Sequence, residues 1–117
     1  MPQITVERSP GLDHVDWAEF ALDLHTVVVE TAAAQPQACK TRVLRTEDEV
    51  VGDERERHAI VNVTIALLPG RTEETKALLT ERVVELLRKH ARSTTGDTLH
   101  LSAEVRELDP SYRKAVV

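Results

Sequence analysis

Aromatic side chains are scarce in this sequence of 117 residues: they make up 3% of it, with one tryptophan, one tyrosine and one phenylalanine. The hydrophobic core must therefore be built from Val, Leu, Ile and Ala, which dominate the 41% of residues that are hydrophobic. A chain of this length has room for one compact core, and 30% charged residues are typical of a folded domain. We therefore expect a single domain over residues 1–117.

Cysteine is nearly absent as well. Cys39 is the only one, which excludes an internal disulfide and makes a reducing cytoplasm the expected location. No basic segment followed by an apolar run is seen at the N-terminus, so we expect no signal peptide. No apolar stretch approaches the roughly 20 residues that span a bilayer, so we expect no membrane association.

Basic residues are fewer than acidic ones: the chain has 15 Lys and Arg against 20 Asp and Glu, which gives a net charge of -5. This balance excludes a general nucleic-acid binder, which needs a basic face to neutralise phosphates. It leaves room for a small anion held by a few local cations. The five histidines do not fall at metal-ligand spacings, so we expect no metal site.

Hydrophobic periodicity predicts four strands and two helices. Strands are expected at residues 2–8, 38–45, 59–68 and 98–106, and the third of these is rich enough in β-branched residues to be buried on both faces. In strand 38–45, residues 38, 40, 42 and 44 should share one face. The segment from 46 to 57 should be a solvated loop, and a short turn or arm should follow residue 108.

The first helix is expected to run from Asp13 to the Gln35-Pro36 pair, with an apolar stripe at spacings of three and four. The second is expected to begin at Thr72 as its N-cap and to end in a turn that contains Lys89, His90 and Arg92. The stripes consist of Trp17, Phe20, Ala21, Leu24, Val27, Val28 and Thr31 in the first helix and Leu79, Val83, Leu86 and Leu87 in the second.

The two halves of the chain match each other at an offset of 59 residues. Pro10-Gly11 falls on Pro69-Gly70, and four apolar positions of the first helix fall on the stripe of the second. We therefore predict an α/β (α+β) fold made of two β-α-β repeats, at about residues 2–45 and 58–107, with a four-stranded sheet and both helices on one face. An apolar, uncovered second face would then favour a homo-oligomer.

Pro2 stands at the head of the first strand. Removal of Met1, which is usual before a small residue, would leave a free secondary amine. An α-amino group has a pKa near 8, and burial close to arginines disfavours its charged form and lowers that value. The neutral amine could then act as a general base near pH 7.

Three cations could bind an anionic substrate. Arg71 follows Pro69-Gly70 at a helix start, where free N–H groups and a guanidinium favour a carboxylate, although an ordinary surface arginine is the simpler reading. Lys40 and Arg42 project from one strand face, and they could equally protect an edge strand from pairing.

Three segments carry a resemblance to a known family. They are Met1-Pro2-Gln3-Ile4-Thr5-Val6-Glu7, then Leu68-Pro69-Gly70-Arg71-Thr72-Glu73-Glu74-Thr75, and finally residues 102–110. In this order they resemble the tautomerase superfamily, and within it the 5-carboxymethyl-2-hydroxymuconate isomerases. The resemblance spans nearly the whole chain and implies a homotrimer without a cofactor.

The resemblance also implies roles for individual residues. Pro2 would be the base that shuttles a proton between substrate atoms, and Arg71 would hold a substrate carboxylate. Lys40 and Arg42 would polarise the 2-oxo group and its neighbouring carboxylate. The family has arginine where this chain has Lys40, and lysine lacks the planar two-pronged donor. The family's substrate is a 2-hydroxymuconate-type dienoate of aromatic catabolism; a general keto–enol tautomerase or a non-catalytic trimer are the alternatives.

Overall fold

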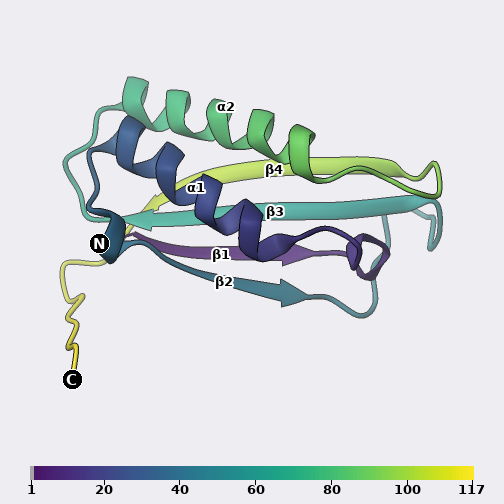
Figure 1. Ribbon diagram of the computed structural model, residues 1–117, viewed down its shortest axis with the longest axis horizontal. Helices are drawn as coiled ribbons and strands as arrows, with labels where there is room; N and C mark the ends of the chain where they lie inside the picture. The colour runs from purple at the N-terminus through teal and green to yellow at the C-terminus, as the bar shows by residue number, and fades with distance from the viewer. Residues whose placement is uncertain (1) are drawn as a thin grey trace.

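One mixed sheet carries both long helices on a single face (Figure 1). The computed structural model describes residues 2–117. Its strands are β1 (Gln3–Arg8), β2 (Lys40–Arg45), β3 (His58–Leu67) and β4 (Thr98–Glu107), and its helices are α1 (Trp17–Ala32) and α2 (Glu73–His90). Two short 3-10 turns, η1 (Pro10–Leu12) and η2 (Pro36–Ala38), flank α1.

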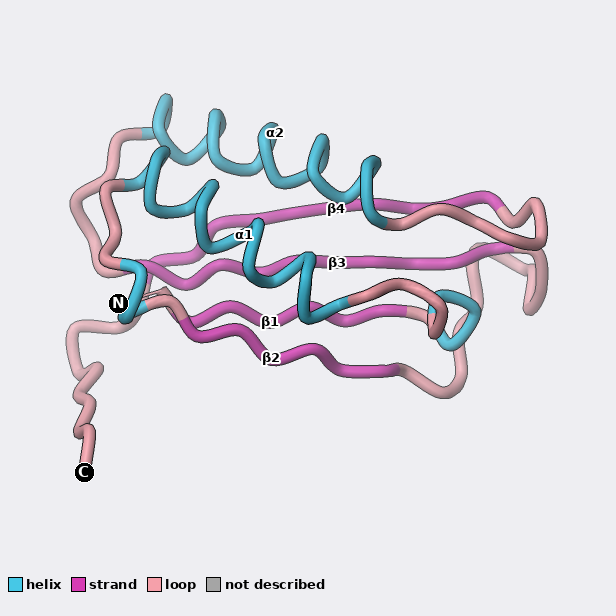
Figure 2. Tube along the Cα trace, viewed as in Figure 1, coloured by secondary structure: helices cyan, strands magenta, loops and turns pink. Residues whose placement is uncertain are grey.

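The strands lie in the order β2-β1-β3-β4. β1 is parallel to β2 and β3 is parallel to β4, whereas the central pair β1 and β3 is antiparallel. The chain is therefore two β-α-β units joined side by side through their first strands. The predicted α+β fold, with four strands and two helices on one face, is confirmed, and Figure 2 shows the two layers with loops at both ends.

The core lies between the sheet and the helices. Alternate residues of β1 and β3 are buried there, and both predicted helical stripes face them. The fully buried side chains include Ile4, Val6, Val61, Val63 and Ile65 from the sheet and Phe20, Leu24, Val28, Leu79, Val83 and Leu87 from the helices. The apolar stripes predicted at an offset of 59 residues are thus the ones that build this core.

The prediction that β3 is buried on both faces is wrong for the single chain. Residues of β3 alternate between buried and half-buried, because only one face meets the helices. The uncovered face is also more polar than expected: Asn62 and Thr64 lie on it in β3, with Ser102 and Glu104 beside them in β4. This face therefore offers polar groups to a partner rather than an apolar surface.

Both helices are shorter than predicted, and α1 ends at Ala32, before the Gln35-Pro36 pair. α1 begins at Trp17 rather than near Asp13, because the carboxylate of Asp16 accepts the N–H of Glu19 at 3.0 Å and caps the helix there. α2 begins after Thr72, as predicted, and Thr72 Oγ1 accepts the N–H of Thr75 at 3.1 Å. α2 ends at His90, so Arg92 lies beyond its last turn.

Strand β2 begins two residues later than predicted. Ala38 lies in η2 and is buried, so it does not share a face with Lys40 and Arg42. The segment from 46 to 57 is more structured than a solvated loop, because Glu49 accepts hydrogen bonds from the hydroxyls of Ser9 and Thr46. No helix within residues 2–117 has the length and apolar character that a bilayer crossing needs.

Candidate active site

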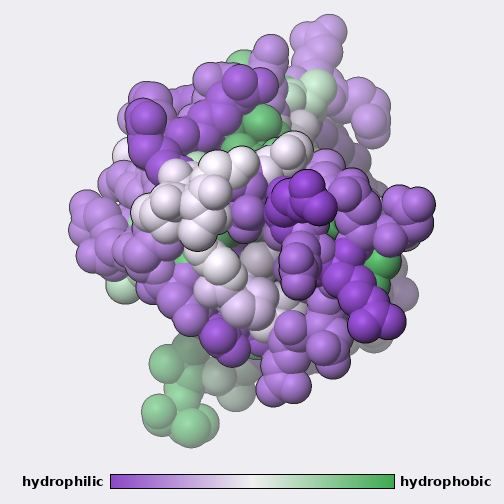
Figure 3. Space-filling view, turned by 90° about the vertical axis from the view of Figure 1, so that its right-hand side faces the viewer, coloured by the Kyte–Doolittle hydropathy of each residue, from purple (hydrophilic) through white to green (hydrophobic). Residues whose placement is uncertain are grey.

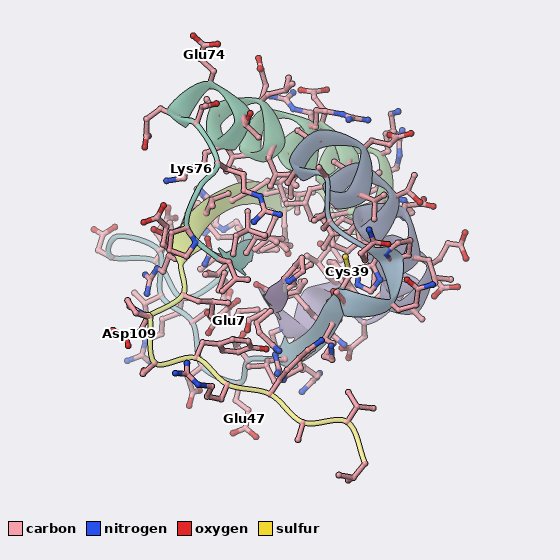
Figure 4. All side chains as sticks on the ribbon, turned by 90° about the vertical axis from the view of Figure 1, so that its left-hand side faces the viewer. Glu7, Cys39, Glu47, Glu74, Lys76 and Asp109 are labelled. Carbon is pink, nitrogen blue, oxygen red and sulfur yellow. The ribbon has the colours of Figure 1, made fainter. Side chains whose placement is uncertain are left out.

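Four chain segments meet at the end of the sheet where β1 begins. Gln3 pairs with Lys40 of β2 on one side and with Ala66 of β3 on the other. The carbonyl oxygen of Pro2 accepts the N–H of Lys40 at 3.2 Å, and Leu67 accepts the N–H of Leu108 at 2.7 Å. The end of α1 and the start of α2 lie at the same end of the molecule, which Figure 4 views directly.

Pro2 is buried at this end. Its burial continues the alternation of Ile4 and Val6, which face the helices, so its ring lies on the helix side of the sheet. The expected removal of Met1 concerns a residue outside the described part of the chain.

Lys40 and Arg42 share the opposite, uncovered face of the sheet, and the prediction that both project from one face is confirmed. Both side chains are exposed. Lys40 Nζ donates to the carbonyl oxygen of Ala38 at 3.3 Å, and Arg42 Nη2 donates to Gln3 Oε1 at 2.6 Å. Lys40 is thus adjacent to Pro2 through the backbone, while its side chain leaves the sheet on the other side.

Arg71 lies in the helix layer, between the end of α1 and the start of α2. Its Nε and Nη2 donate to the carbonyl oxygen of Ala32 at 3.1 and 3.0 Å, and its Nη1 donates to Leu68 O at 3.3 Å. The chain turns left-handed at Ala33, with a φ of 54°, and leaves the last carbonyls of α1 without helical partners. The guanidinium satisfies one of them and complements the negative end of the helix dipole.

A groove of about 490 Å³ opens beside Arg71. Its lining comes from the end of α1 and the turn before α2, and consists of Thr31, Ala32, Ala33, Pro69, Gly70, Arg71, Thr72 and Thr75. Gly70 has a φ of 125°, which only glycine adopts readily, so the tight turn depends on it. The lining includes neither Pro2 nor the two cations of β2.

Gln3 makes two hydrogen bonds at this end that could not be predicted from the sequence pattern. Gln3 Nε2 donates to the hydroxyl of Tyr112 at 3.0 Å, so Gln3 links Arg42 to the C-terminal arm. The arm itself turns at Asp109, whose carboxylate accepts the N–H of Ser111 at 2.8 Å. Hydrogen bonds from the side chain and backbone of Ser111 lower the pKa of Asp109.

Two further groups near this end, Lys76 and Cys39, have shifted pKa values. Lys76 donates to Glu107 at 3.1 Å and ties α2 to the end of β4; this hydrogen bond is the main reason why the pKa of Lys76 is raised. Cys39 is buried in the core, and burial raises the pKa of its thiol. No group of three or more metal-ligating side chains forms within residues 2–117.

Comparison with solved structures defines the class of fold. A 5-carboxymethyl-2-hydroxymuconate isomerase from Deinococcus radiodurans R1 matches with a TM-score of 0.84 at 24% identity, covering 97% of this chain and 88% of that one. A fused 4-OT wild-type symmetric trimer matches with a TM-score of 0.76 at 16% identity, covering 97% of this chain and 92% of that one. The fold is therefore that of the tautomerases.

A family model shows to which family within this fold the chain belongs. The family model described as 5-carboxymethyl-2-hydroxymuconate isomerase matches residues 2–116, so this chain belongs to the 5-carboxymethyl-2-hydroxymuconate isomerase family. A search of curated proteins finds no match to the chain. Membership over nearly the whole length supports an isomerase or tautomerase activity.

Proposed function

We propose that this protein isomerises a 2-hydroxymuconate-type dienoate, converting 5-carboxymethyl-2-hydroxymuconate to its 2-oxo-3-ene isomer in the cytoplasmic breakdown of aromatic compounds. The observation that carries the proposal is the family match over residues 2–116, which includes Pro2 at the head of β1. The reaction is a proton shift within one molecule and balances without a cofactor.

In the proposed mechanism, the amine of Pro2, freed by removal of Met1, takes the proton of the 2-hydroxyl group. The C2–O bond becomes a carbonyl, the double bonds shift along the chain, and the same proton is returned from the proline nitrogen to C5. The burial of Pro2 supports this role, because an apolar setting favours the neutral amine that can accept a proton near pH 7.

Negative charge gathers on the C2 oxygen as the proton moves. We assign its stabilisation to Lys40 and Arg42, and the binding of a more distant carboxylate to Arg71. Arg71 has five N–H donors and uses three in its bonds to Ala32 and Leu68, so two remain for a ligand in the groove.

A second copy of the chain would complete this site. In one chain the ring of Pro2 faces the helices, whereas Lys40 and Arg42 lie on the opposite face of the sheet. We therefore propose a homotrimer, which the similarity to a symmetric trimer supports. Light scattering should give three times the chain mass of 13.1 kDa; a monomer with full activity would contradict a shared site.

A general keto–enol tautomerase with another substrate is the second candidate. The observation that favours it is Lys40 in place of the family's arginine, because one ammonium cannot bind a carboxylate and an oxo group as a planar fork does. The third candidate, a non-catalytic trimer, would turn over neither the muconate substrate nor a simple keto–enol substrate.

The test compares the purified protein on two substrates. We expect kcat/KM for 5-carboxymethyl-2-hydroxymuconate to exceed kcat/KM for a simple keto–enol substrate. The opposite preference would favour the general tautomerase, and no turnover of either substrate in a correctly processed trimer would favour the non-catalytic protein.

A further inference from the structure

Two histidines meet at the end of the sheet farthest from Pro2. His58 begins β3, and His100 in β4 pairs with Ile60, so both side chains lie on the uncovered face of neighbouring strands. His58 Nδ1 lies 3.0 Å from His100 Nε2, and the ring centroids are 5.1 Å apart. Since Gln3 pairs with Ala66, eight residues along β3, this cluster lies about 26 Å from the candidate active site.

A carboxylate fixes the orientation of the first ring. Glu54 Oε1 lies 2.9 Å from His58 Nε2. Because an ionised carboxylate only accepts hydrogen bonds, Nε2 carries the proton of the neutral ring and Nδ1 presents a lone pair toward His100. The backbone of Glu54 is itself held by hydrogen bonds in both directions with Val51, at 2.9 and 3.0 Å.

We propose that His58 Nδ1 and His100 Nε2 together bind a transition-metal ion such as Zn²⁺, with Glu54 as the outer carboxylate that orients His58. Neutral imidazole is a preferred ligand of Zn²⁺, Ni²⁺ and Cu²⁺, and ligating histidines commonly donate their other N–H to a carboxylate. His100 need only carry its proton on Nδ1 for both facing nitrogens to offer lone pairs.

The spacing of the two nitrogens is close to what a metal requires. Tetrahedral Zn²⁺ with Zn–N bonds of about 2.0–2.1 Å separates two ligand nitrogens by roughly 3.3–3.4 Å. The observed 3.0 Å therefore needs the rings to part by a few tenths of an ångström. The exposed His100 ring has the freedom for that movement.

The surroundings favour a cation and leave room for water ligands. Figure 3 shows this end of the molecule as a mainly hydrophilic surface. A cavity of about 320 Å³ adjoins His58, and its lining includes more carboxylates than cations: Glu47, Glu49, Glu54, Glu56 and Asp97 against Arg55 and Arg57. Since no third metal-ligating side chain joins the pair within residues 2–117, water would fill the other positions and the ion would exchange.

Zinc titration of tag-free protein by calorimetry tests the proposal. We expect one Zn²⁺ per chain, and at least tenfold weaker binding in His100→Asn and in Glu54→Gln, the latter because loss of an outer carboxylate weakens metal sites by about 10–100-fold. The matched control is His14→Asn, since His14 is an exposed histidine whose Nε2 lies 2.7 Å from the carbonyl oxygen of Arg92. Equal binding by the wild type and His100→Asn, or equal weakening in His14→Asn, would overturn the proposal.

A second readout identifies the ligands directly. X-ray absorption at the zinc edge should show two imidazole nitrogens per metal in the wild type and one in His100→Asn. Zinc should also raise the melting temperature of the wild type more than that of His100→Asn, because an ion bound only by the folded state stabilises it. Melting without metal shows whether each variant is folded. Two imidazoles per zinc in His100→Asn would place the metal elsewhere.

Discussion

Arg71 donates two hydrogen bonds to the carbonyl oxygen of Ala32, the last residue of α1. This contact joins the two β-α-β units, because Arg71 stands at the start of α2 and belongs to the second unit. The side chain that the family resemblance assigns to a substrate carboxylate is therefore also a cap of the first helix. Its two functions can be separated by measuring stability and activity in the same variants.

Replacing Arg71 with alanine should lower the free energy of unfolding by about 1–2 kcal/mol, since hydrogen bonds from a charged donor and a helix-end charge are lost together. Urea denaturation measures this change. The control is Arg88→Ala, which removes an exposed ion pair with Glu85 and should change stability by less than about 0.5 kcal/mol. An unchanged urea midpoint in Arg71→Ala would show that the cap does not contribute to the free energy of unfolding.

Acid should weaken the fold through Asp13. Two hydrogen bonds from Arg45, at 2.8 and 3.1 Å, and a further one from Arg8 hold the pKa of Asp13 well below its ordinary value. A depressed folded-state pKa contributes stability that is present above the unfolded value of about 3.9 and is lost as the pH falls toward the folded value.

The corresponding experiment compares urea midpoints of the wild type and Asp13→Asn at pH 6, 4 and 3. The wild type should be more stable at pH 6, and the difference should shrink at pH 3, because Asp13→Asn has no carboxylate to protonate there. Asp53→Asn, which alters an exposed loop carboxylate, should show no such convergence. A difference that stays constant across the three pH values would contradict the role given to Asp13.

The hydrogen bond between Gln3 and Tyr112 should restrain the C-terminal arm. Tyr112→Phe keeps the ring and removes the hydroxyl, so we expect trypsin to cleave after Arg113 several-fold faster. Thr5→Val, on the same face of β1 but without a contact to the arm, provides the control. Identical cleavage rates in the wild type and Tyr112→Phe would show that this hydrogen bond does not hold the arm.

Lys40→Arg introduces the residue that the family resemblance implies at this position. If the missing planar donor limits the reaction, kcat for the muconate substrate should rise about tenfold, which corresponds to roughly 1.4 kcal/mol of transition-state stabilisation. Lys89→Arg, at the far end of α2, should leave kcat unchanged. If turnover in Lys40→Arg does not rise, Lys40 is not the limiting difference.

Hydrophobic periodicity predicted the buried faces of the helices, because each apolar stripe is formed by residues close together in the sequence. Phe20 and Leu79, 59 residues apart, are both fully buried, and so are Val28 and Leu87. Periodicity could not tell which face of β3 is covered, since Ile60 and Val61 are both β-branched and only the position of the helices distinguishes them. The start of α1 depended on which acidic residue caps it, and the structure shows that Asp16 does so rather than Asp13.

In the candidate site too, local patterns could be predicted from the sequence, whereas contacts between distant residues could not. A period of two placed Lys40 and Arg42 on one face, and the match of the turns singled out Arg71. The contact of Arg71 with Ala32 spans 39 positions and that of Gln3 with Tyr112 spans 109, so neither follows from a local pattern. The face on which Pro2 lies, opposite the cations of β2, likewise required the register of the sheet.

If the amine of Pro2 is the catalytic base, replacing Pro2 with alanine should remove most of the activity. Intact mass should show that Met1 is absent from both the wild type and the variant, so that each begins with a free amine. We then expect kcat/KM for the muconate substrate to fall by about 10²–10⁴-fold in Pro2→Ala, the usual contribution of a general base. Equal activity in the two proteins, or an active wild type that retains Met1, would show that the amine of Pro2 is not the base.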